Sequence, residues 1–253
     1  MTERKPRWWL RILSVVVVLG VLVCGAEFAL RMIIPGVIEN VVRGQLKLTS
    51  DHPVEVDLGG SALLSAVQGG VGDVTINIDK VPLLDGVETD ATFQAAKVPF
   101  NPLSGKITNG TVELVVPKDQ LGSVVKMLTS GVAQTGEVQN GSLVVGRSIE
   151  LFGQEVGLTA KLGLKVNDGA VEIDPQGVNA AGFDLTAEQL ADATGTLLDP
   201  ILQPQTVCVR DQLPAGVTLT DITLSSTGSA RIKADLNPGI FSDSKQQQPG
   251  SCG

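Results

Sequence analysis

The chain has 253 residues, with 19 basic and 27 acidic side chains and a formal charge of −8. Residues 1–31 hold five of the basic groups and two of the acidic ones, so the rest of the chain carries a formal charge near −11. Such an acidic surface repels nucleic acid and disfavours flat docking on an anionic membrane. Because there is no tyrosine and both tryptophans lie at positions 8 and 9, the remainder lacks the aromatic platforms of a sugar-binding groove.

The N-terminus reads as a membrane segment over residues 1–31. Four basic residues precede an uncharged apolar run over 12–26, a pattern that keeps the N-terminus in the cytoplasm and exports the downstream part of the chain. The run is shorter than the roughly 20 residues of a spanning helix, but apolar residues extend it on both sides and no clean cleavage site comes after it. We favour an uncleaved anchor, hence a single-pass protein of the cell membrane with an extracytoplasmic domain. The alternative is a cleaved signal and a secreted or periplasmic protein.

Residues 32–236 are predicted to form the folded domain. Apolar residues at three- and four-residue spacings predict a helix over 33–48, with Pro35 in its first turn. A short helix or turn is expected over 61–68. Alternating apolar and polar residues predict strands over 54–58, 73–79, 87–95, 107–116, 142–145, 149–152, 156–166, 171–173, 217–224 and 230–236.

The clearest strand covers residues 156–166, where eleven residues alternate strictly between apolar and polar or small. This period of two indicates a strand that buries one face only. Asn167-Asp168-Gly169 after it is a strong hairpin turn. Two later helices are predicted, over 118–130 and over 186–198. The second begins with a capping box formed by Thr186 and Gln189.

Together these elements predict an α+β fold in which long antiparallel strands wrap around amphipathic helices and form a half-open tube. Its aliphatic lining leaves a cavity for acyl chains, although the pattern alone fits a packed core without a cavity equally well. We expect the apolar side chains of the helices and of the turn to face the interior. The candidate lipid-binding residues are therefore Leu63, Leu64, Val124, Leu128, Leu190 and Leu197, with ordinary core packing as the alternative for each.

The two cysteines beyond the membrane segment, Cys208 and Cys252, form an even pair. An oxidising compartment would permit a disulfide between them, which we predict; two free thiols are the alternative. Residues 237–253 are rich in Pro, Gly, Ser and Gln and are predicted to be a disordered tail.

Candidate catalytic groups are scarce. His52, the single histidine, lies between Asp51 and Pro53 and is predicted to be an exposed loop residue, and no cysteine cluster accompanies it, so no metal site and no cofactor are expected. The many Asp and Glu residues leave open an enzyme acting on glycolipid, which would need two carboxyl groups about 5–10 Å apart in a concave site. A third possibility is an anchored scaffold that binds envelope enzymes through a strand edge.

Residues 54–64 (VEVDLGGSALL), residues 70–78 (GVGDVTINI) and the late residues 213–217 (LPAGV) carry a family likeness. In these segments the chain resembles the actinobacterial LmeA-like family of cell-envelope phospholipid-binding proteins. The resemblance implies a tubular lipid-binding fold akin to half of the bactericidal/permeability-increasing type (BPI/TULIP-like), with a phospholipid ligand. We therefore expect a non-catalytic, extracytoplasmic protein that binds or transfers phospholipid, with its protein partner unknown.

Overall fold

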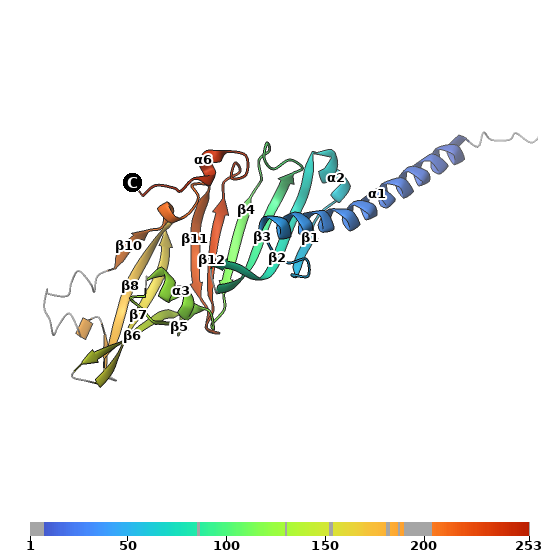
Figure 1. Cartoon of the computed structure of the whole chain (residues 1–253). Coiled ribbons are helices and arrows are strands. Elements are labelled where there is room, and N and C mark those ends of the chain that lie inside the picture. Colours follow the sequence, from blue (N-terminus) through green and yellow to red (C-terminus); the bar gives the residue numbers. More distant parts are fainter. Residues whose placement is uncertain are drawn as a thin grey trace, which may run out of the picture.

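The computed structural model describes residues 8–84, 87–129, 131–151, 154–180, 183–186, 188–189 and 204–252. It begins with α1 (Trp8–Gln45), a single helix of 38 residues that reaches out from the sheets (Figure 1). The helix predicted over 33–48 is the C-terminal part of α1, but its predicted start is wrong, because Pro35 lies inside α1 and not in a first turn. Proline removes one backbone N–H, but Ile34 and Ile38 pack on the adjacent sheet and stabilise the helix on both sides of it.

Six antiparallel strands form the first sheet, called sheet A. Their order is β1 (Val54–Leu58), β2 (Gly70–Leu84), β3 (Val87–Pro99), β4 (Gly110–Val116), β12 (Ala230–Leu236) and β11 (Val217–Leu224). The short helix α2 (Ala62–Val67) connects β1 to β2, as predicted. The predicted strands of this sheet are confirmed, except that β4 starts only at Gly110 because Asn109 before it has a positive φ of 49°.

The second sheet, called sheet B, is also antiparallel. Its order is β10 (Gln205–Cys208), β8 (Ala170–Ala180), β7 (Gln154–Asn167), β6 (Ser142–Leu151) and β5 (Thr135–Gln139), and β9 (Phe183–Thr186) also pairs with β8. The predicted hairpin turn is confirmed, with φ of 50° at Asp168 and 74° at Gly169. The strands predicted at 142–145 and 149–152 are one continuous strand, β6.

Helix α3 (Leu121–Leu128) joins the two sheets, at the position predicted from its apolar stripe. Leu121 is buried in one cluster with Val116 and Ala230 of sheet A and with Val138 of sheet B. The helix lies so close to β5 that a Cβ on Gly136 would stand 2.5 Å from Cγ2 of Val125. The fold is thus α+β with two antiparallel sheets, and α3 packs where they meet.

The C-terminal residues are folded, so the predicted disordered tail over 237–253 is wrong for its described part. Ile240 is buried, and α6 (Ser244–Gln247) comes after it. The backbone then hydrogen-bonds to residues 213–216, with Ala215 N–H donating to the Gln248 carbonyl at 2.8 Å and Gly250 N–H to the Leu213 carbonyl at 2.9 Å. The polar composition suggested disorder, but backbone hydrogen bonds hold this segment without a large apolar core of its own.

Candidate functional site

One face of sheet A is apolar across all six strands. A row of cross-strand pairs runs from Ile76 to Phe93, then to Val112 and Ala234. A parallel row runs through Ile78, Ala91, Leu114, Ile232 and Ile222. Because directly paired residues point to the same face, these rows make one continuous hydrophobic surface.

The burial of this surface changes along the sheet. Near β1 and β2, Val54, Ile76 and Ile78 are buried, and Ile34 and Ile38 of α1 pack against their cluster. Farther along, Leu114, Ile232 and Ile222 are only half-buried. α1 therefore covers one end of the surface, while the strands beyond β3 keep part of their apolar side chains accessible.

Sheet B repeats this pattern on its own apolar face. Leu162 pairs with Leu143, and Leu164 pairs with Ile173, and all four side chains are half-buried. The polar face of β7 carries Lys161 and Lys165, which are exposed. The alternation predicted for residues 156–166 is therefore real, but its apolar side is not sealed into a dry core.

The two apolar faces meet beside α3, because β11 lies against β7 and α3 packs on both sheets. We call the half-buried part the open apolar face and define it by these residues: Leu114, Leu162, Leu164, Ile173, Ile222 and Ile232. An apolar face that runs over two sheets and stays partly accessible is a candidate contact surface for an apolar ligand. Aliphatic side chains make dispersion contacts with hydrocarbon, and they carry no acidic, basic or nucleophilic group that could act in catalysis.

Among the described residues, the predicted lipid-binding side chains do not gather at one place: Leu63 and Leu64 lie on α2, and Val124 lies on α3. Val124 of α3 is half-buried beside the cluster that joins the sheets. Leu63 is half-buried on α2, but the side chain of Leu64 points outward and is exposed, so it does not line the interior as expected. Leu128 lies in α3, but its side chain falls outside the described residues, as do Leu190 and Leu197 entirely.

The start of the second predicted helix is present. Thr186 N–H donates to Oε1 of Gln189 at 2.9 Å, and Gln189 N–H donates to Oγ1 of Thr186 at 3.2 Å, which is the predicted capping box. Most of the helix beyond it lies outside the described residues. The residues of the open apolar face were not among the residues predicted to bind lipid, because only the order of the strands brings them together. The alternation of apolar and polar residues along each strand was the signal that could have identified them.

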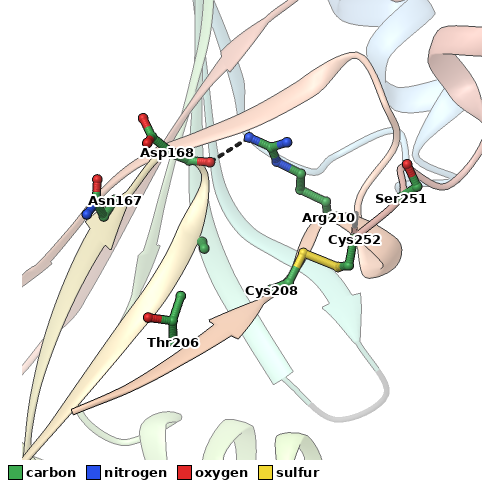
Figure 2. A pocket seen from close by; sticks show the side chains of 8 residues that line it. Asn167, Asp168, Thr206, Cys208, Arg210, Ser251 and Cys252 are labelled. Carbon is green, nitrogen blue, oxygen red and sulfur yellow. Dashed lines mark hydrogen bonds between the residues drawn. A yellow bond between two sulfur atoms is a disulfide. The ribbon is translucent and has the colours of Figure 1, made fainter.

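A small polar pocket of about 340 Å³ lies at the end of sheet B (Figure 2). The structure joins Cys208 and Cys252 in a disulfide at its wall, with 5.9 Å between their Cα atoms. Arg210 donates from Nη2 to the Asp168 carbonyl at 2.6 Å, and so ties the β7–β8 hairpin turn to this wall. Figure 2 shows that the guanidinium of Arg210 points toward the hairpin turn. The residues around this pocket therefore link parts of the fold to one another, and we do not assign them a ligand.

A wider groove of about 450 Å³ crosses the polar face of sheet A and includes Glu113 and Asp235. Glu113 is already paired, with Arg231 at 2.9 Å and Lys233 at 3.3 Å, which makes it a poor candidate for a general acid.

His52 is half-buried, where the sequence predicts it exposed, and its Nε2 lies 2.7 Å from the Asp79 carbonyl oxygen. Among the described residues, no group of three His, Cys, Asp or Glu side chains could hold a metal ion.

Helix α1 holds the one segment of the described residues that is long and apolar enough to cross a membrane, Leu13–Gln45. The mean hydropathy of its most apolar 18 residues is 2.5, and none of these 18 residues is buried in the protein. A signal sequence near the N-terminus meets the same criteria of length and composition, so these properties fit an anchor and a signal alike.

Comparison with known proteins gives one clear relationship. A family model described as LmeA-like phospholipid-binding matches residues 25–228, a range that covers the last part of α1, α3, sheet B and all of sheet A except β12. No curated protein and no solved structure matches the chain significantly. On the match across most of its length, the chain belongs to the LmeA-like phospholipid-binding family.

Proposed function

We propose that this protein is a non-catalytic, extracytoplasmic phospholipid-binding protein of the cell envelope, which holds acyl chains against the open apolar face. The observation that carries the proposal is the half-buried state of Leu114, Ile232 and Leu164, which lie in apolar cross-strand pairs of sheets A and B. Membership of a phospholipid-binding family supports the choice of ligand.

The chemistry of the face favours an acyl chain over a polar ligand. A hydrocarbon chain needs a long, smooth surface of aliphatic groups, and it needs no hydrogen-bond partner along its length. The open apolar face offers leucine and isoleucine from neighbouring strands, while the lysines of β7 lie on the opposite side. A bound lipid would therefore place its chains along the sheets and leave its head group in water.

The proposal also makes α1 an uncleaved anchor. The basic residues before the apolar run hold the N-terminus in the cytoplasm, so the sheets would lie outside. A cysteine introduced at Thr2 should then react with an impermeant maleimide only after the cell membrane is opened. A cysteine at Lys165 should react in intact spheroplasts, and the opposite result would contradict the proposed orientation.

Lipid binding is tested by native mass spectrometry of the full chain, delipidated in detergent and then incubated with phospholipid vesicles. We expect one or more phospholipid adducts on the unchanged protein. Leu164→Gln should lose most of them, because an amide on the open apolar face disfavours hydrocarbon. Lys165→Gln is the matched control, since the neighbouring residue points to the other face and should bind lipid normally.

Leu164→Phe adds a second measurement that does not depend on a polar substitution. The larger ring should fill space on the face and lower lipid retention while the protein keeps its native circular dichroism spectrum. If no variant differs from the unchanged protein, or if the unchanged protein retains no phospholipid with any of several head groups, the proposal is wrong.

A further inference from the structure

The carboxylate of Glu27 ties α1 to α2 where the apolar run 12–26 ends. Its Oε1 accepts the N–H of Ala62 at 2.8 Å, and its Oε2 accepts the N–H of Leu63 and the hydroxyl of Ser61, each at 2.8 Å. The first N–H groups of a helix have no partner inside it. Glu27 supplies that partner from another helix, and so fixes the position of α2 along α1.

Arg31, one helical turn farther on, strengthens this attachment. It donates from Nε to Glu27 at 2.8 Å, and its Nη atoms donate to the carbonyls of Leu58 and Gly60. Since a helix rises about 1.5 Å per residue, Glu27 and Arg31 lie about 6 Å apart along α1. The segment from the end of β1 to the start of α2 is therefore held at the level where the apolar run of α1 ends.

Four large apolar side chains are exposed on α2 and on the turn that adjoins it. Leu64 and Val67, three residues apart on α2, are 60% and 80% exposed, and Phe100 and Leu103 in the turn after β3 are 59% and 74% exposed. The two segments are joined by a 3.2 Å hydrogen bond from Phe100 N–H to the Gly69 carbonyl. We call these four residues the α2 patch.

The α2 patch is separate from the open apolar face. It lies beside the point where α1 leaves sheet A, at the end of the molecule away from sheet B (Figure 1). Single exposed apolar residues are ordinary, but four on two adjoining segments mark a contact surface. Because the exported part is acidic, electrostatic attraction cannot hold it flat on an anionic membrane; a small apolar edge next to the span can still enter the lipid.

We propose that the α2 patch inserts into the head-group region of the outer membrane surface, directly beside α1. The occupant of the patch is thus a lipid surface, and α1, α2 and the turn after β3 form one rigid membrane contact. This inference rests on the proposed membrane span of α1, and is independent of lipid binding on the open apolar face. Its consequence is a fixed orientation, with α2 at the membrane and sheet B farthest from it.

The test uses the full chain reconstituted in vesicles of phosphatidylcholine with phosphatidylglycerol. Single nitroxide labels are placed by Val67→Cys, Leu103→Cys, Leu19→Cys and Lys165→Cys in a Cys24→Ala background, with the Cys208–Cys252 disulfide kept. The collision rates with oxygen and with a water-soluble nickel complex give the depth of each label. We expect Val67 and Leu103 about 5–10 Å below the phosphates, as for interfacial helices.

The two other labels separate the possible failures. Leu19 lies in the middle of the apolar run and should report hydrocarbon, while Lys165 on sheet B should report water. If Leu19 is in hydrocarbon but Val67 and Leu103 match Lys165, the α2 patch does not enter the membrane and the inference is wrong, with the anchor intact. If Leu19 also reports water, the proposed anchor and the inference both fail. Spin–spin broadening at Val67 that disappears on dilution with unlabelled protein would assign the patch to a second copy and overturn the inference.

Discussion

The Glu27 carboxylate of α1 and the backbone N–H of Leu63 in α2 are joined by a 2.8 Å hydrogen bond, although 36 residues separate them. Through this bond the long apolar helix becomes part of the folded domain. Ile34 and Ile38 continue the attachment by packing against sheet A. Any movement of α1 relative to the sheets must break these contacts.

Glu27→Gln should loosen α2. The variant loses the ion pair with Arg31. The amide has a single acceptor oxygen, which cannot accept all three hydrogen bonds from residues 61–63. We expect faster hydrogen–deuterium exchange of the amides in α2, measured by mass spectrometry on the full chain in detergent. Glu39→Gln is the matched control, because Glu39 pairs with Arg43 in the same i, i+4 arrangement of α1. Equal exchange in the two variants would contradict the role of Glu27.

Gly136→Ala should push α3 away from β5. The new Cβ would stand 2.5 Å from Cγ2 of Val125 and 3.3 Å from the Leu121 carbonyl oxygen. Overpacking of this kind costs about 1–3 kcal/mol in unfolding free energy, measurable by urea titration. Gly157→Ala on β7 is the control: nothing lies within 4 Å of the position that its new Cβ would take, so a change of about 0.5–1 kcal/mol in the stabilising direction is expected. A Gly136→Ala protein as stable as the parent would show that α3 is not seated as described.

Leu121→Ala should be among the most destabilising single changes. Leu121 is 3% exposed and belongs to the cluster that holds α3 between the two sheets. Truncating a buried leucine costs about 2–5 kcal/mol through lost burial and the cavity left behind. Leu103→Ala, which truncates an exposed leucine of the α2 patch, should change the unfolding free energy in detergent little. Both variants are compared by the same urea titration. Similar losses of unfolding free energy in the two variants would refute the assignment of Leu121 to the core.

The disulfide predicts a simple thiol count. Under denaturing, non-reducing conditions the full chain should show one reactive thiol, that of Cys24, because Cys208 and Cys252 are bonded. Three reactive thiols would contradict the bridge. Closing a loop with a sequence separation of 44 residues adds at most about 4 kcal/mol in the chain-entropy model, so Cys252→Ser should lower the unfolding free energy by up to that amount. Cys24→Ser is the control and should leave it unchanged.

Local patterns predicted most of the elements. The alternation over 156–166, the Asn167-Asp168-Gly169 turn and the stripe of α3 each depend on residues close in sequence, and all three are confirmed. The family relationship was also visible in the residues around β1 and β2, and the family match over residues 25–228 confirms it.

Features that depended on distant partners could not be predicted. The order of sheet A places β12 between β4 and β11, and no local pattern encodes that neighbour. Glu27 directly follows the apolar run over 12–26, and no local pattern shows that three of its hydrogen-bond donors come from residues 61–63. The segment 246–250 looked disordered for the same reason, since its hydrogen bonds go to residues 213–216. Long-range backbone pairing leaves little trace in composition.

The place of β12 has a consequence for how the protein reaches its folded form. The residues that pair between β4 and β12 are 114 to 126 positions apart in sequence. A chain that emerges N-terminus first therefore presents β1–β4 with the free edge of β4 unpaired until almost the whole chain has appeared. Such non-local pairing makes folding slow, and a free strand edge invites aggregation. Chaperones that shelter β4 before β12 is made would raise the yield of native protein, and a chain that stops before Ala230 would leave sheet A incomplete.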